Sequence, residues 1–193
     1  AHSIIVFPGG AGTAEEVLYL LSVLMDERNR DIPYSFILAA PVERKDYFES
    51  LDQFIRATLG EAATDHYQII VGDPEAVAQA AKQGVEQVRR HRMKKQDAYS
   101  FNWDLAIDHE SQRPFIPTHE HMAALNLTRD QPANRLAAQL RCAFSGIVAG
   151  NVKPDGVSLI EEFGPFILKG SEDISHSLNK LLTSFVADKR MTL

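Results

Sequence analysis

A glycine-rich segment near the start of the chain leads directly into two glutamates. It follows the apolar run Ile4–Phe7 and reads Pro8-Gly9-Gly10-Ala11-Gly12-Thr13-Ala14-Glu15-Glu16. Glycines at a strand-to-helix turn let backbone N–H groups approach an anion with no Cβ in the way. The N-terminus of the following helix adds unpaired N–H donors and the positive end of its dipole. The segment therefore predicts a phosphate site.

The spacing of these glycines argues against two better-known nucleotide loops. No Gly-Lys-Ser/Thr follows, so the segment is not a Walker loop. Gly10-x-Gly12 begins a dinucleotide fingerprint, but Glu15 stands where the third glycine belongs. That departure disfavours a nicotinamide-dependent oxidoreductase.

The two glutamates point to chemistry beyond phosphate binding. A carboxylate in the first helical turn repels a bound phosphate, so a pure phosphate site would gain nothing from it. It becomes useful if a reaction develops positive charge beside the phosphorylated group. Thr13 and Glu16 also fit a capping box, in which each side chain accepts from the other residue's N–H group. Because two glutamates follow the glycines, we favour a catalytic role over a cap.

The glycine segment resembles the signature of the LOG ("lonely guy") family of phosphoribohydrolases, which were long described as lysine decarboxylases. The shared pattern is Pro8-Gly9-Gly10-x-Gly12-Thr13-x-x-Glu16. Later segments resemble a long branch of this family that carries an additional C-terminal region. These segments are Asp97–Trp103, Phe144–Lys153 and Glu161–Pro165. The resemblance covers essentially the whole chain.

The resemblance implies hydrolysis of the N-glycosidic bond of a nucleoside 5′-monophosphate to the free base and ribose 5-phosphate, and we expect no cofactor and no metal. Glu16 matches the family's catalytic glutamate, which would stabilise an oxocarbenium-like ribosyl cation or activate water. Glu15 would hydrogen-bond the ribose hydroxyls. The Thr13 hydroxyl and a set of backbone N–H groups would hold the 5′-phosphate, from Gly9, Gly10, Gly12 and Thr13. A non-catalytic nucleotide sensor with the same loop is the alternative, and nothing marks the Schiff-base lysine that a decarboxylase would need.

Strand–helix alternation predicts an α/β fold. We interpret residues 1–92 as the C-terminal half of a Rossmann-like parallel-sheet domain and residues 93–193 as a mostly helical C-terminal extension. Strands are expected at Ile4–Phe7, Tyr34–Ala40 and Tyr67–Val71. Helices are expected at Ala14–Met25, Glu43–Leu59, from Pro74 to about Arg92, and near Thr118–Leu127, Pro132–Ala149 and Ser171–Ala187. Residues 98–117 are expected to be irregular, with a strand or two.

The first apolar run also bears on where the polypeptide begins. Ile4–Phe7 has the composition of a strand buried on both faces, and such a strand needs neighbours and covering helices. The later strands are too few to supply them, and the chain begins at Ala1. We therefore expect a C-terminal part of a longer polypeptide, with the family's arginine on the segment before the glycine loop. Residues 1–193 expressed alone should be poorly folded or aggregated, and inactive even if soluble, because Ile4–Phe7 would become a hydrophobic edge strand.

Composition narrows the classes of partner. The formal net charge of −6 argues against non-specific binding to nucleic acid or an anionic membrane. No apolar run approaches the roughly 20 residues that span a bilayer. The single cysteine, Cys142, rules out an internal disulfide and a Cys-rich zinc site and suits a reducing cytoplasm. A cytoplasmic homo-oligomer is our expectation.

Three further clusters fit structural roles better than functional ones. His119 and His121 would diverge on a helix, which disfavours a metal site. Tyr99, Phe101 and Trp103 alternate at strand spacing and fit core packing better than stacking on a base. The basic stretch at 89–95 suits a solvated helix C-terminus. The resemblance offers an alternative for that stretch, an effector site for an alarmone nucleotide.

Overall fold

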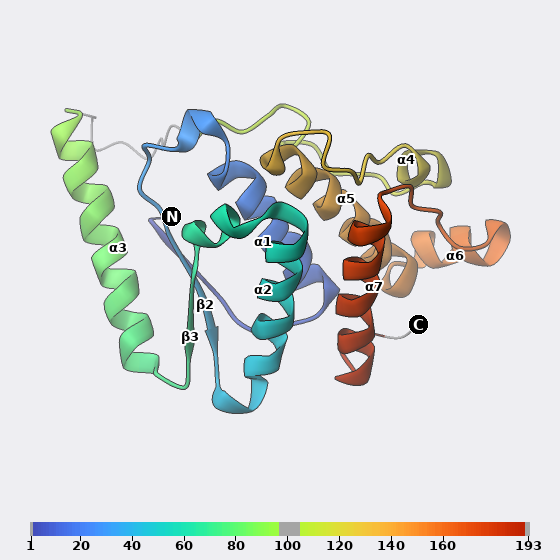
Figure 1. The fold of residues 1–193 in the computed structure, drawn as a ribbon, viewed down its shortest axis with the longest axis horizontal. Helices are drawn as coiled ribbons and strands as arrows, with labels where there is room; N and C mark the ends of the chain where they lie inside the picture. The colour runs from blue at the N-terminus through green and yellow to red at the C-terminus, as the bar shows by residue number, and fades with distance from the viewer. Residues whose placement is uncertain (1, 97–104, 192–193) are drawn as a thin grey trace.

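Helices surround one small parallel sheet (Figure 1). The structure, a computed structural model, describes residues 2–96 and 105–191. Tyr99, Phe101 and Trp103, expected to pack in a core, lie outside these ranges. The strands are β1 (Ser3–Val6), β2 (Ser35–Ala40) and β3 (Gln68–Val71). They run parallel in the order β1-β2-β3, which confirms the expected α/β class.

Seven α-helices are described. Those between and after the strands are α1 (Ala11–Leu24), α2 (Lys45–Leu59) and α3 (Pro74–Lys94). Short 3-10 turns lie at Glu27–Asn29, Val42–Arg44 and Glu61–His66. The later helices are α4 (His119–Ala123), α5 (Ala133–Val152), α6 (Pro154–Phe163) and α7 (Glu172–Ala187). Residues 105–117 are irregular, and α6 was not expected from the sequence. α3 continues through residue 92, so no break in the helix marks the expected boundary there. The division into residues 1–92 and 93–193 stays a prediction.

The elements form layers that run from α3 at one end to α6 at the other (Figure 1). α3 packs against β1 and β2, whereas α1 and α2 lie on the other side of the sheet. α5 packs along α1, and α7 packs along α2. The helical extension therefore covers the two helices that follow β1 and β2.

The strands differ in burial. β2 is buried at every residue, because it has a strand on each side and helices on both faces. On β1, by contrast, Ile5 is 39% exposed, and Phe7 beyond it is 63% exposed. Among the described residues, Ile4–Phe7 therefore contributes a partly exposed edge strand and is not buried on both faces. In the part of the chain that the structure describes, β1 pairs with β2 along one edge and has no strand on the other, and α3 leaves part of its face uncovered.

Aromatic contacts join the extension to α2. Tyr47 stacks on Phe185 of α7, with ring centroids 5.1 Å apart. Phe54 meets Phe144 of α5 edge-on, with centroids 6.0 Å apart. All four side chains are buried. Removing such a buried phenyl ring typically costs about 3–5 kcal/mol, so these contacts hold α5 and α7 firmly against the sheet half.

Gly84 lets α3 approach β2, and this gives a first prediction. A Cβ at position 84 would lie 2.1 Å from the Cβ of Ser35. An alanine inside a helix is normally more stable than glycine by up to about 1 kcal/mol, but here the steric clash should outweigh that gain. We expect Gly84→Ala to lower the free energy of unfolding by about 1–3 kcal/mol. The free energy of unfolding is measured by denaturant unfolding of the full-length protein.

The matched control is Gln83→Ala at the exposed neighbouring position of α3, which should be neutral or stabilising. Equal stabilities of the two variants would contradict the close approach of α3 and β2.

Candidate active site

α1 begins inside the glycine segment, three residues earlier than the sequence predicted. Ala11 is its first residue and Gly10 its N-cap, with no side-chain cap. Gly12 and Thr13 therefore lie in the first turn, where N–H groups have no partner within the helix. The capping-box interpretation is wrong, because Thr13 is the third residue of the helix and not its N-cap.

The inner side of the loop is held by α2. A Cβ on Gly9 would lie 2.0 Å from Oγ1 of Thr13, so any other residue here would force the Thr13 side chain to shift. The phenol of Tyr47 in α2 donates to the carbonyl of Gly10 at 2.8 Å. Burial raises the pKa of the Tyr47 hydroxyl, so it keeps its proton at neutral pH. The loop is thus fixed from the side that faces the core.

The other side of the loop carries unpaired donors. Among the described residues, no backbone carbonyl accepts a hydrogen bond from the N–H groups of Gly10, Ala11, Gly12 or Thr13. The dipole of the 14-residue helix α1 places its positive end at the same point. This arrangement has the donors and the charge that an anion needs.

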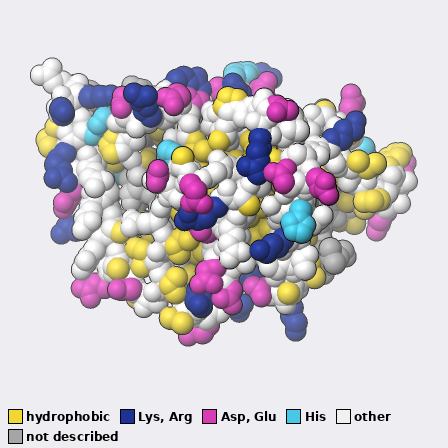
Figure 2. All heavy atoms as spheres, viewed as in Figure 1, with side chains coloured by type: hydrophobic (Ala, Val, Ile, Leu, Met, Phe, Trp, Pro, Cys, Tyr) yellow, Lys and Arg dark blue, Asp and Glu magenta, His cyan; other side chains and the backbone are white. Residues whose placement is uncertain are grey.

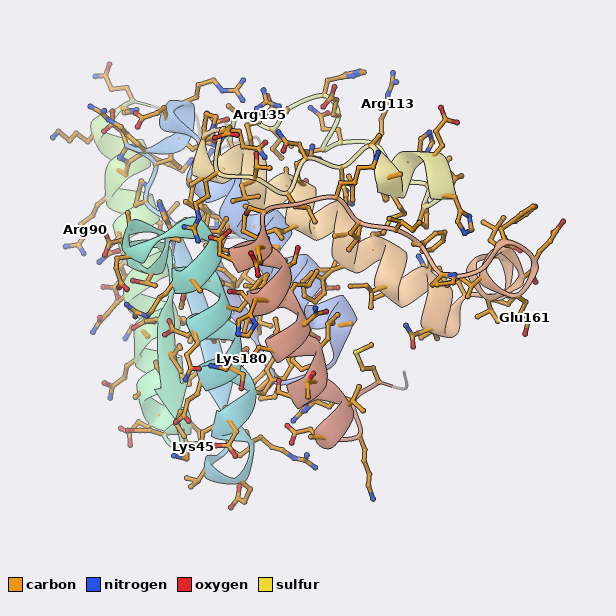
Figure 3. All side chains as sticks on the ribbon, turned by 45° about the vertical axis from the view of Figure 1, so that its right-hand side comes forward. Lys45, Arg90, Arg113, Arg135, Glu161 and Lys180 are labelled. Carbon is orange, nitrogen blue, oxygen red and sulfur yellow. The ribbon has the colours of Figure 1, made fainter. Side chains whose placement is uncertain are left out.

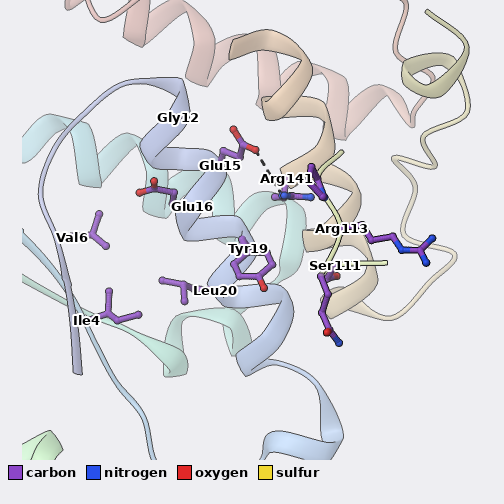
Figure 4. Close-up of a pocket in the computed structure, with 12 residues that line it drawn as sticks. Ile4, Val6, Gly12, Glu15, Glu16, Tyr19, Leu20, Ser111, Arg113 and Arg141 are labelled. Carbon is purple, nitrogen blue, oxygen red and sulfur yellow. Dashed lines mark ion pairs between the residues drawn. The ribbon is translucent and has the colours of Figure 1, made fainter. Parts of the chain in front are cut away.

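A cavity of about 720 Å³ opens beside α1, within the size range of small-molecule sites (Figure 4). Its wall consists of Ile4 and Val6 of β1, Gly12, Glu15, Glu16, Tyr19 and Leu20 of α1, Ser111–Pro114, and Arg141 of α5. Of the predicted site residues, Gly12, Glu15 and Glu16 thus share one wall. Gly10 and Gly12 line a second cavity, of about 660 Å³, on the side of the α7 C-terminus. Gly9 and Thr13 line neither of these two cavities.

The two glutamates differ in direction and in partner (Figure 4). Glu15 points to Arg141, with Oε1 3.8 Å from Nε, and both side chains are about four-fifths buried, at 21% and 18% exposed. The Arg141 guanidinium also lies over the ring of Tyr19, 5.6 Å from its centroid. Glu16 points toward β1 and is exposed. A paired carboxylate and an open carboxylate therefore stand side by side on one helix.

Sequence reasoning missed Tyr19, Arg141 and the 111–114 segment. Arg141 carried a usable signal, because it is a lone cation between the apolar residues Leu140 and Ala143 of a helix. A charge in such a place is seldom left without a partner. The 111–114 segment carried no signal that would bring it to α1.

An ion-pair network anchors the segment that forms the far wall of the cavity. Arg28 bridges Asp26 at 2.7 Å and Asp108 at 2.8 Å, and Arg135 pairs with Asp108 at 3.0 Å. Hydrogen bonds from Arg28 lower the pKa of Asp26 to about 2. Arg135 and Arg113 lie at the same end of the molecule in Figure 3, and the Arg113 side chain points away from its body.

This network predicts a defined loss of stability in acid. The folded-state pKa of Asp26, about 2, lies below the unfolded value of about 3.9. Its stabilisation is therefore present above about pH 4 and is lost as the pH falls toward 2. We expect Asp26→Asn to lower the free energy of unfolding at pH 7 and to flatten its decline between pH 4 and 2, measured by urea unfolding.

The control for that series is Asp31→Asn, which removes an exposed carboxylate nearby and should keep the wild-type pH profile. Parallel profiles for wild type and Asp26→Asn would contradict the role of the network.

The remaining candidates have structural partners. His119 Nε2 lies 2.8 Å from the carbonyl oxygen of Gly164, and His121 Nδ1 lies 2.7 Å from that of Ile116. Within residues 2–96 and 105–191, no group of three His, Cys, Asp or Glu side chains could hold a metal ion. Over the same residues, no helix is long and apolar enough to cross a membrane. Figure 2 shows acidic and basic side chains mixed over the visible face.

Comparison with known proteins shows which families the two halves of the chain resemble. Residues 1–81 match the family model "Possible lysine decarboxylase", which confirms the resemblance based on the glycine segment. Residues 85–193 match the family model "Pyrimidine/purine nucleotide monophosphate nucleosidase, C-terminal". Relatives named pyrimidine/purine nucleotide 5′-monophosphate nucleosidase occur in Escherichia coli strains K12, O6:H1 and O157:H7. Each is 52% identical over 193 residues, which are 100% of this chain and 42% of the relative.

The chain thus spans less than half the length of the curated relatives it matches. The second match covers more than half of the chain, from the middle of α3 to the last residue. The chain belongs to the family described as the C-terminal region of pyrimidine/purine nucleotide monophosphate nucleosidases.

Proposed function

We propose that this chain forms part of an enzyme that hydrolyses the N-glycosidic bond of nucleoside 5′-monophosphates to the free base and ribose 5-phosphate. The observation that carries the proposal is the arrangement on α1. Its unpaired N–H donors are followed, one turn later, by Glu15 and Glu16 on the wall of one cavity. One turn is about 5.4 Å, comparable with the span from the 5′-phosphorus to the anomeric carbon of a ribose.

The phosphate group would bind at the start of α1. Its oxygens would accept hydrogen bonds from the N–H groups of Gly9, Gly10, Gly12 and Thr13 and from the Thr13 hydroxyl. Binding energy at this remote group would hold the glycosidic bond in position for attack. The fixed inner side of the loop supports this role, because donors that are already oriented lose little entropy on binding.

The two carboxylates would then act on the ribose. In the reaction the C1′–N bond breaks, its electron pair leaves with the base, and the base takes up a proton. Water adds its oxygen to C1′ and releases a proton. The open carboxylate of Glu16 would stabilise the oxocarbenium-like cation or accept the proton of water. Glu15, held by Arg141, would accept hydrogen bonds from the ribose hydroxyls.

Three other functions fit less well. Among the described residues no lysine lines the 720 Å³ cavity, so the amine of a Schiff-base decarboxylase has no counterpart there. A nicotinamide-dependent enzyme is disfavoured by Glu15 at the third glycine position. A non-catalytic nucleotide sensor would bind the same ligand at the same loop, and the release of free base separates it from an enzyme.

We further propose that the enzyme is a cytoplasmic homo-oligomer. A homo-oligomer is supported by hydrophobic side chains at the α6 end of the molecule (Figure 2), where Val152, Phe163 and Ile167 are exposed. The single Cys142 fits a reducing cytoplasm. An alarmone nucleotide as effector rests on the basic C-terminal end of α3, at 89–95.

Glu16 gives the most direct test of catalysis. We expect Glu16→Gln in the full-length protein to lower the kcat for AMP by about 10²–10³, because the amide keeps the shape but loses the charge. AMP should still bind. Free adenine is measured by chromatography, and Glu86→Gln on the exposed side of α3 is the control for removing one carboxylate. Near-normal turnover by Glu16→Gln would remove the catalytic role.

The phosphate site makes a second prediction about substrates. Nucleoside 5′-monophosphates should be cleaved and the corresponding nucleosides should not, since a nucleoside lacks the group that the loop holds. The comparison is kcat/KM for AMP against adenosine with the same enzyme preparation. Similar values for the two compounds would show that the glycine loop does not anchor the substrate.

A further inference from the structure

Arg190, which follows the end of α7, returns to the glycine loop from the far end of the chain. Its Nη1 donates to the carbonyl of Gly9. Its guanidinium lies over the ring of Tyr47, 4.8 Å from the centroid, and its Nε lies 3.4 Å from Asp188. The side chain is only 11% exposed. An arginine so placed is a fixed part of the loop's surroundings and not a solvated chain end.

The backbone of this segment is fixed as well. The Arg190 N–H donates to the carbonyl of Phe185 at 2.8 Å, which turns the chain back at the end of α7. The Arg190 carbonyl oxygen lies 3.0 Å from where a Cβ on Gly10 would stand. Gly10 therefore allows the close approach of this segment to the loop.

The contact with Gly9 decides where the next N–H group points. The described peptide bonds include no cis bond, and in a trans peptide the C=O and N–H groups point in opposite directions. Since the Gly9 carbonyl points to Arg190, the Gly10 N–H points away from it. The Gly10 carbonyl points to Tyr47 in the same way, which directs the Ala11 N–H outward. Arg190 and Tyr47 thus orient two consecutive peptide units.

We infer that Arg190 is a positioning residue for the phosphate site, an inference that rests on the proposed function. Two adjacent glycines leave the Gly9–Gly10 peptide free to rotate unless a partner holds it. Arg190 supplies that partner as a charge-assisted donor and adds one positive charge near the N-terminus of α1. The negative groups nearby are Asp188, which pairs with it, and Glu16, whose charge acts on Tyr47.

The test compares phosphate binding in matched variants of the full-length protein. Arg190→Met keeps the stem that packs on Tyr47 but removes the donor, whereas Arg190→Lys keeps a donor and the charge. Lys180→Met removes the same charge from α7 at a side chain that contacts Gln53, 3.3 Å away (labelled in Figure 3). Binding of ribose 5-phosphate and of ribose is measured by calorimetry, and AMP hydrolysis gives KM and kcat.

We expect Arg190→Met to weaken binding of ribose 5-phosphate on the order of ten-fold, the usual effect of one hydrogen bond to a charged group. KM for AMP should rise in step, and kcat should change by less than about three-fold. Arg190→Lys should lie between wild type and Arg190→Met, and Lys180→Met should match wild type. A purely structural arginine would instead lower the active fraction, and with it kcat, at unchanged KM.

Unchanged affinity for ribose 5-phosphate in Arg190→Met overturns the inference. If that variant fails to fold, Arg190→Lys decides, with weaker binding supporting the role and wild-type binding overturning it. If wild type binds the sugar phosphate but releases no base from AMP, the proposed hydrolysis fails while the role of Arg190 is still read from binding. If wild type binds neither ribose 5-phosphate nor AMP, both proposals fail.

Discussion

The first N–H groups of α1 cannot be satisfied within their own helix, and no backbone carbonyl of the described residues pairs with them. β1 leads directly to the start of α1, and the glycines there have no side chains that would block access to the N–H groups. Tyr47 and Arg190 donate hydrogen bonds to the carbonyl oxygens of Gly10 and Gly9. The N–H groups of the same peptide units therefore point outward. Unpaired donors are unfavourable unless water or a ligand meets them. Their position beside two glutamates is the basis on which we propose a nucleotide site at this helix end.

The site draws on both halves of the chain. α1 contributes the donors and both glutamates, whereas α5 contributes Arg141 and the segment after α7 contributes Arg190. The two family models meet between residues 81 and 85, yet side chains from both matched regions meet around α1. The helical extension is therefore part of the site's construction, because it packs along α1 and α2 and carries two of the cations around them.

The sequence was informative where a local pattern has one physical meaning. Glycines between an apolar strand and an apolar helix indicated the loop, and alternation of elements indicated the parallel sheet. It was misleading at the start of α1, because glycine is a poor helix former and Thr13 is a good N-cap. It was silent on Arg190, more than 170 residues from the loop it contacts, since an Asp-Lys-Arg ending reads as a solvated helix end. The apolar composition of β1 indicated a strand, but its burial depends on which strands and helices lie beside it, and composition alone does not reveal those.

We infer that one nucleotide spans the start of α1 and its second turn. A crystal structure of the full-length Glu16→Gln protein soaked with AMP tests it most directly. We predict the phosphate within hydrogen-bond distance of the N–H groups from Gly10 to Thr13, and the anomeric carbon beside the side chain at position 16. Density for AMP at another site, or with the base in place of the phosphate at the start of α1, would contradict the account.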